Sequence, residues 1–377
     1  MIIKPELIET VIFTIYIIFI SVSGIQLIYY WGIFSRLAFY SKKTESKHHL
    51  PVSVVIAARN EYFNLQENLP LILEQDYPEF EVVVVNNSSN DESEYLLKEL
   101  SDKYDKLKIV NIRENVNFFK GKKFPLSVGI KSAKNEYLLL IDADCKPTSN
   151  KWIENMQSAF DEKTQIVLGY GPYMPKKSIL NTIIRFDTIQ IAMQYLSYSL
   201  IGLTYMGVGR NLAYTKSLFH KSKGFSSHYK IMSGDDDLFI NNVTNRKNTG
   251  IMINSDSFTY SESEDSFSNW TKQKKRHLST GKYYKFKHKF LLGLYSLSLF
   301  LFYLTGISLL IIVFNIEIVV SLFALKLISQ IFIFKKCMIK LNEKNLLLIS
   351  PILEIVLLCI NPVLSFANLI VKTNKWK

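Results

Sequence analysis

Long apolar runs are the feature that most restricts what this chain of 377 residues can fold into. Residues 8–33 are nearly free of charge after Glu9, and residues 290–314 and 316–334 form two further runs that only Asn315 separates. At about 1.5 Å per residue of helix, each run is long enough to cross a bilayer. A cleaved signal peptide is the alternative for the first run, but the run is too long for one and lacks a preceding basic region.

A fourth apolar run, residues 345–371, is interrupted by Pro351 and Pro362 and contains Glu354. Because proline removes a helical hydrogen bond, this run predicts either one kinked span or a pair of half-spans. The four runs divide the chain into three predicted parts: an N-terminal transmembrane helix at residues 1–34, a globular domain at 35–289, and a C-terminal transmembrane region at 290–377.

The basic residues gather beside these runs and predict an orientation. They are Arg36, Lys42, Lys43 and Lys47 after the first run, Lys285, Lys287 and Lys289 before the second, and Lys335, Lys336, Lys340 and Lys344 after the third. By the positive-inside rule the globular domain is cytosolic, in a membrane that we expect to be the bacterial inner membrane. The net charge of +12 is then mostly a collar that faces membrane lipids, which argues against a nucleic-acid partner.

The C-terminal tail conflicts with a single crossing of the last run. Lys372, Lys375 and Lys377 would lie outside the cytosol if residues 345–371 crossed once. This conflict favours a re-entrant or paired arrangement of that run.

The globular part alternates between strand-like and helix-like segments. Continuous apolar runs at 51–58, 81–85 and 137–141 read as buried strands, whereas 64–73 and 92–100 have helical patterning. Such alternation predicts an α/β domain with a mostly parallel sheet that is covered on both faces. A further segment, residues 178–201, has apolar residues at helical spacing with Arg185, Asp187 and Gln190 among them, so it is either packed in the core or lies in the membrane interface.

Two clusters of acids could perform chemistry. Asp142 and Asp144 directly follow the strand at 137–141, and the carboxyl ends of strands bind ligands in open α/β sheets. Two such carboxylates can hold Mg²⁺ or Mn²⁺ together with substrate phosphates. Asp235, Asp236 and Asp237 are three adjacent acids, which read either as a helix N-terminus or as a general base whose pKa its acidic neighbours tune.

Two basic segments are ambiguous when taken alone. The segment QKKRH at residues 273–277 is either part of the basic collar or a set of donors for a diphosphate, for which arginine is well suited. The segment KGKK at 120–123 is either a phosphate cradle or a solvated turn. It lacks the Gly-x4-Gly-Lys-Ser/Thr pattern, so ATPase activity has no support.

Taken in order, these segments resemble glycosyltransferase family 2, over about residues 50–280. The opening VVIAARNE at 54–61 is similar to the family's first strand, and this likeness implies that Asn60 and Glu61 contact the nucleotide. KGKKFPLSVG at 120–129 places Lys122 at the lysine that approaches the donor, and IDADCKP at 141–147 matches the family's metal motif, in which Asp144 holds the metal and Asp142 lies beside it and the donor.

The later segments resemble the branch of cellulose, chitin and hyaluronan synthases. GDDDLFIN at 234–241 is similar to the Gly-Asp-Asp segment, which places Asp236 at the catalytic base with Asp235 one step away. QKKRH fits the Gln-x-x-Arg-Trp pattern except at its last position, which implies that Gln273, Arg276 and His277 face the acceptor and the diphosphate. The resemblance implies an inverting enzyme with a GT-A fold.

Two departures from the family pattern bear on the substrates. Asn86 and Asn87 stand where the family has an Asp pair that recognises the nucleotide base, so Asn87 is expected to contact the base. Because Asn can donate as well as accept hydrogen bonds, the pattern does not fix the nucleotide, and UDP is the first choice. His277 replaces a Trp that stacks on the acceptor in processive synthases, which favours transfer of one sugar.

The expected function is therefore metal-assisted transfer of a sugar from a nucleotide sugar, with UDP as the first choice, to a lipid-linked or saccharide acceptor. One alternative is a synthase that loads sugar onto a polyprenyl phosphate, although such enzymes usually lack the Gln-x-x-Arg segment. Another is an inactive membrane scaffold that only binds a nucleotide sugar, for which the Asn86-Asn87 change is the best support.

Overall fold

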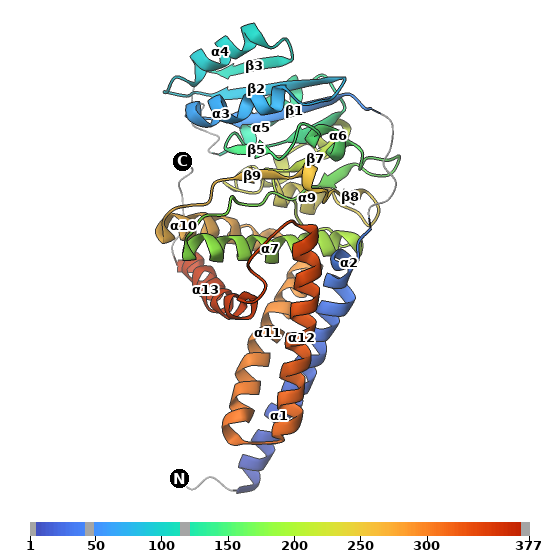
Figure 1. Cartoon of the computed structure of the whole chain (residues 1–377), viewed down its shortest axis with the longest axis vertical. Helices are drawn as coiled ribbons and strands as arrows, with labels where there is room; N and C mark the ends of the chain where they lie inside the picture. The colour runs from blue at the N-terminus through green and yellow to red at the C-terminus, as the bar shows by residue number, and fades with distance from the viewer. Residues whose placement is uncertain (1–4, 42–48, 114–120, 371–377) are drawn as a thin grey trace.

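A computed structural model describes residues 5–41, 49–113 and 121–370. An α/β domain lies at one end of the molecule and a bundle of long helices at the other (Figure 1). The strands are β1 (Val52–Ala58), β2 (Phe80–Asn87), β3 (Leu107–Ile112), β4 (Tyr137–Leu140), β5 (Cys145–Pro147), β6 (Ile166–Leu168), β7 (Leu212–Thr215), β8 (Thr249–Ile251) and β9 (Thr259–Ser261). The helices of the domain are α3 (Tyr62–Leu73), α4 (Ser93–Lys103), α5 (Lys123–Ser132), α6 (Trp152–Gln157), α7 (Ile179–Leu200), α8 (Lys216–Lys221), α9 (Asp237–Val243) and α10 (Phe267–Leu278).

Seven strands form one sheet in the order β3-β2-β1-β4-β7-β6-β8. The pairs β1–β2, β1–β4, β2–β3 and β6–β8 are parallel, whereas β7 runs antiparallel to β4 and β6. Neighbouring residues of β1 enter different cores, since Val54 packs with one buried cluster and Val55 with the other. Both faces of the sheet are therefore covered, which is why its strands read as unbroken apolar runs. The mostly parallel α/β fold is confirmed, with β1, β2, β4, α3 and α4 at the predicted places.

Three long helices form the bundle that leaves the domain. They are α1 (Pro5–Ile28), which continues through a π-helical turn and α2 (Ser35–Ala38), α11 (Phe286–Ile312) and α12 (Ile316–Lys340). Each is long and apolar enough to cross a membrane. The predicted tight turn at Asn315 is present, and Val313 and Asn315 adopt the left-handed conformation with φ of 59° and 44°.

Helix α7 joins the domain to this bundle. It crosses the molecule between the sheet and the long helices (Figure 1). Phe186 of α7 stacks on Phe334 of α12 with ring centroids 5.8 Å apart. Its two charged residues form buried ion pairs, Arg185 with Glu343 and Asp187 with Lys274. Much of α7 is therefore buried between the domain and the bundle, as the core-packed alternative for residues 178–201 predicts.

The last apolar run differs from the prediction of paired half-spans. Residues Ser350–Ile370 form one continuous helix, α13, with Pro362 inside it. This helix satisfies the length and composition of a membrane span. However, it lies to one side of the bundle, at the end nearest the domain and next to α7 and α10 (Figure 1), and the side chain of Asn368 donates to the carbonyl of Lys275 in α10 at 2.7 Å. A proline inside a helix removes one backbone bond without requiring a break, which explains the continuity.

Candidate active site

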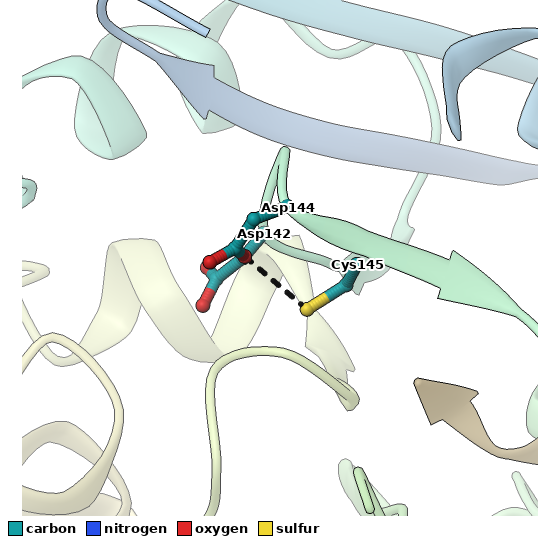
Figure 2. A group of neighbouring side chains, drawn as sticks. All are labelled: Asp142, Asp144 and Cys145. Atoms are coloured by element: carbon teal, nitrogen blue, oxygen red, sulfur yellow. Dashed lines mark hydrogen bonds between the residues drawn. The ribbon is translucent and has the colours of Figure 1, made fainter. Parts of the chain in front are cut away.

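Asp142 and Asp144 lie just beyond the end of β4 and point to the same side (Figure 2). Ligand atoms of Asp142, Asp144 and Cys145 all lie within 4.8 Å of one another. The Cys145 thiol is buried, which raises its pKa, and it donates to Asp144 at 3.4 Å. Two carboxylates suit Mg²⁺ or Mn²⁺ as ligands. The protonated Cys145 thiol would serve as a hydrogen-bond donor to Asp144 rather than as a metal ligand.

The electrostatics of the pair also fit a cation. Burial and the neighbouring Asp142 raise the pKa of Asp144. Burial acts in the same direction on Asp142, but the ion pair with Lys122 outweighs it and lowers the pKa of Asp142. A divalent cation would relieve the repulsion between the two carboxylates, so the residues present fit the predicted metal site.

Two adjacent lysines at the start of α5 have different environments. Lys122 forms the ion pair with Asp142. The buried ammonium of Lys123 instead donates to the carbonyls of His228, Ile231 and Ser233 at 2.7–2.8 Å. All three ammonium donors are thereby satisfied, and the loop that leads into the acidic cluster is tied to α5. The sequence did not distinguish the two roles; Lys120, the first residue of the segment, lies outside the described residues.

The acidic cluster begins α9. Asp236 is the N-cap: its carboxylate accepts from the amides of Gly209 at 2.9 Å and Asp237 at 2.7 Å. Burial and then the charge of Asp237 raise the pKa of Asp236 to about 6. The Asp237 carboxylate is buried and accepts from the hydroxyls of Thr280 and Tyr284. Asp237 therefore has a structural role, whereas Asp236 is held in a fixed orientation and stays partly accessible.

Asp235, the first acid of this cluster, is half-buried. Burial and the charge of Asp236 raise its pKa to about 6, while Lys122 acts in the opposite direction. The charge of Asp142 also acts on it. Asp235 therefore lies within electrostatic range of the carboxylate and lysine of the predicted metal site.

Asn60, Glu61 and the Asn86-Asn87 pair lie at the ends of β1 and β2, the strands next to β4 in the sheet. Asn60 has a φ of 55°, and its side chain accepts from the amide of Asn90 at 2.8 Å. The Asn86 amide donates to Asn111 of β3 at 3.1 Å, and Asn87 is half-buried. These side chains therefore line the same carboxyl edge as Asp142, as predicted for residues around one ligand.

Helix α10 carries the basic segment. Gln273 accepts from the hydroxyl of Tyr173 at 3.4 Å, and Arg276 lies close enough for its charge to lower the pKa of Asp142. Lys274 is buried in its ion pair with Asp187 and faces away from the site. His277 is exposed at the edge of the site, and desolvation and then the charges of Arg276 and Arg210 lower its pKa below the usual range, so its imidazole is neutral at physiological pH.

Arg210 is a charged residue of this site that the sequence did not single out. It follows Gly207, Val208 and Gly209 immediately before β7. Its charge acts on Asp142, Asp144 and His277 alike. The only available signal was a lone arginine in a glycine-rich segment that enters a strand, which is compatible with many roles.

The structure therefore brings together Lys122, Asp142, Asp144, Asp235, Asp236 and Arg276, with Gln273 and His277 on the adjoining helix. Asn60, Glu61 and Asn87 lie along the neighbouring strand ends. Their individual roles remain predictions.

Residues 53–221 match the sequence model of the family described as glycosyl transferase family 2. A poly-β-1,6-N-acetyl-D-glucosamine synthase of Staphylococcus epidermidis is 34% identical over 134 residues, which are 34% of this chain and 31% of the relative. A β-monoglucosyldiacylglycerol synthase of Trichormus variabilis is 29% identical over 121 residues, 31% of this chain and 25% of the relative. The matches thus span about a third or less of these relatives.

Among solved structures, a mannosyltransferase of Pyrobaculum calidifontis in complex with GDP-mannose and Mn²⁺ has a similar fold. The TM-score is 0.55 at 15% identity, and the alignment covers 87% of this chain and 98% of that one. At this identity the likeness concerns the fold, which is the GT-A fold.

Proposed function

We propose, from the premise that this chain carries a glycosyltransferase family 2 domain at residues 53–221, that it transfers a sugar from a nucleotide-sugar donor with inversion at the anomeric carbon. The observation that carries the proposal is the placement of the acid pair Asp142 and Asp144, the cations Lys122 and Arg276, and the oriented carboxylate of Asp236 in one site. A direct displacement needs these three components: a diphosphate site, groups that stabilise the leaving group, and one base.

On the donor side, Asp142 and Asp144 would hold Mg²⁺ or Mn²⁺, which supplies positive charge to the diphosphate when bound. Lys122, now paired with Asp142, would exchange this partner for a phosphate oxygen, and Arg276 would reach the same group from α10. Asn60, Glu61 and Asn87 would contact the nucleoside. UDP is the first candidate on the family resemblance. The structural neighbour binds GDP-mannose, so GDP-sugars are the second candidate.

On the acceptor side, Asp236 removes the proton from the attacking hydroxyl. Its two oxygens each accept one backbone amide, and a carboxylate has about four lone-pair sites, so it can still accept the acceptor's proton. Gln273 and His277 would position the acceptor, which is a saccharide or a lipid-linked sugar. The neutral imidazole of His277 is a smaller stacking surface than tryptophan, which favours transfer of one sugar.

The test is donor turnover by the full chain in membranes. Membranes that contain the protein are incubated with a panel of UDP- and GDP-sugars, with Mn²⁺ or Mg²⁺ and with EDTA, and the labelled product is identified. We expect one donor to be consumed, a β-linked product from an α-linked donor, and loss of turnover with EDTA. If no donor is consumed under any condition, the proposal is wrong, and the result supports the alternative of an inactive scaffold that only binds a nucleotide sugar.

We further propose that three spans anchor the enzyme with its catalytic domain in the cytosol, in the bacterial inner membrane. In this arrangement α1, α11 and α12 cross, and α13 lies along the cytosolic face beside α10. The contact of Asn368 with α10 supports it, because it holds the end of α13 on the side of the catalytic domain. The arrangement also removes the conflict over the basic tail, whose residues lie outside the described range.

A reporter fused after Lys377 tests this topology. We expect a green fluorescent protein fusion to fluoresce and an alkaline phosphatase fusion at the same place to be inactive, because that enzyme needs the oxidising periplasm. Fusions in the turn at Asn315 serve as the control and should show the opposite pattern. An active phosphatase fusion after Lys377 would mean that α13 crosses the membrane.

A further inference from the structure

We infer that Arg210 is a substrate-binding residue whose guanidinium holds a phosphate oxygen in the active site. This inference rests on the proposed function, because it assigns a ligand group to the same site. The first observation is that the side chain is rigidly held. Its guanidinium carbon lies 4.1 Å from the ring centroid of Tyr173, and one terminal nitrogen donates to the hydroxyl of Ser261 at 3.0 Å.

The backbone of the site is shaped around this side chain. A Cβ atom added at Gly171 would lie 2.8 Å from the Cγ of Arg210, so only glycine leaves room for the arginine in its present position. Tyr173, on which the guanidinium stacks, also donates to Gln273 of α10. Tyr173 therefore connects Arg210 to α10, the helix that carries the predicted acceptor and diphosphate residues.

This arginine has no direct ion-pair partner in the described part of the chain, although the charges of Asp142 and Asp144 lie close enough to act on it. Among the described residues, no carboxylate oxygen lies within 4.0 Å of its guanidinium. Its Nε is buried and has no hydrogen-bond partner within the described part of the chain. By contrast, Arg185, which is also buried, is neutralised by Glu343 at 2.6 Å. A half-buried guanidinium that no carboxylate contacts directly is costly, so an anionic ligand is expected to complete the site.

The position of Arg210 indicates what that anion is. The preceding residue, Gly209, donates its amide to Asp236, so the backbone that carries Arg210 is anchored to the proposed base. On its other side its charge acts on Asp142 and Asp144. A planar guanidinium with free donors suits phosphate oxygens. The phosphate could belong to the donor diphosphate or to a phosphorylated lipid acceptor, since both would meet between the metal site and the base.

The experiment uses the full chain in nanodiscs with Mn²⁺. Binding of UDP and GDP is compared with binding of uridine and guanosine for the wild type, Arg210→Lys and Arg210→Gln. If the phosphate is the donor's, we expect diphosphate affinity to fall about tenfold or more in Arg210→Gln with nucleoside binding unchanged, as for loss of a charged hydrogen bond. Arg210→Lys keeps the positive charge but loses the planar set of donors and the stacking on Tyr173. Its diphosphate affinity should therefore lie between those of the wild type and Arg210→Gln.

A second arm addresses the other source. Nanodiscs that carry a polyprenyl phosphate are compared with nanodiscs that carry the uncharged polyprenol. If the phosphate is the acceptor's, Arg210→Gln should lose the preference for the phosphorylated lipid while it keeps UDP affinity. Arg246→Gln is the matched control, since Arg246 is exposed and lies in the loop between α9 and β8.

Two negative results have different meanings. If the folded Arg210→Gln protein keeps both the diphosphate affinity and the lipid preference of the wild type, the inference about Arg210 is wrong. If the wild type itself binds no nucleoside diphosphate in the presence of metal, the proposed function fails instead. A melting temperature close to that of the control variant shows that the Arg210 variants are folded.

Discussion

Asp236→Asn is expected to lower the rate of sugar transfer by about 10²- to 10⁴-fold, the contribution of a positioned general base, while donor affinity stays within a few-fold of the wild type. The amide has the size of the carboxylate, and its single oxygen can keep the N-cap bond from the Asp237 amide, while the second bond, from Gly209, is lost because the NH2 group cannot accept it. The variant also loses the ability to take a proton. Single-turnover transfer and equilibrium binding of the donor, measured on the same preparation, separate these two effects.

Asp235→Asn is the matched variant, because the neighbouring residue has a similarly raised pKa but lies within electrostatic range of Lys122 and Asp142. We expect this change to weaken donor or metal affinity more than it lowers the rate at saturating donor. If the two variants show the reverse pattern, the base is Asp235. Near-normal turnover in both would remove the acidic cluster from the mechanism.

The pH dependence of transfer should identify the same residue. The pKa of Asp236 is raised to about 6 by burial and by Asp237, and the base acts only when ionised. The rate is therefore expected to be level above pH 7 and to fall about tenfold per pH unit below pH 6. Asp235→Asn should keep this acidic limb at saturating donor, although its midpoint should shift to lower pH because one neighbouring negative charge is gone. Loss of the limb in that variant would contradict the assignment.

The sheet was predictable because its physical requirements are local. A strand covered on both faces needs an unbroken apolar run, and the runs at β1, β2 and β4 could hardly form anything else between polar turns. The acids after β4 followed from the same logic, since the end of a parallel strand is where ligands bind. The different roles of two adjacent lysines could not be predicted. Nothing in the segment KGKK shows that Lys122 pairs with Asp142 whereas Lys123 donates to a loop about a hundred residues later.

Residues whose meaning depends on distant partners could not be read from the sequence. The role of Arg210 can be inferred only from its surroundings in the fold, where Tyr173 and Ser261 contact its guanidinium and no carboxylate of the described residues does. The path of α13 depends on the surface of α10, which no local pattern specifies. Lys326 belongs to the same class, because it lies within an apolar run and its partner follows 28 residues later.

The largest expected effect on stability concerns this lysine. Lys326 of α12 forms an ion pair with Glu354 of α13, and its ammonium also donates to Gln330 at 2.7 Å and Tyr303 at 3.1 Å. Glu354 in turn accepts from the hydroxyls of Tyr30 at 2.9 Å and Tyr303 at 3.0 Å. The side chains of the pair are 3% and 0% exposed. Four helical segments of the bundle thus meet at one buried charge pair, which fixes α13 against the others.

Replacing only one residue of the Lys326–Glu354 pair should lower the free energy of unfolding far more than replacing both. Lys326→Met leaves the Glu354 carboxylate buried without a counter-ion, and we expect a loss of about 3–5 kcal/mol, as for other broken buried pairs. Lys326→Met combined with Glu354→Leu should recover most of that loss, because two apolar side chains can fill the space without a desolvated charge. Denaturant unfolding in detergent of both single variants, Lys326→Met and Glu354→Leu, and of the double variant, with the exposed Lys335→Met as control, gives the coupling energy. A double variant as unstable as the single one would show that the pair is required for α13 to dock, rather than merely tolerated there.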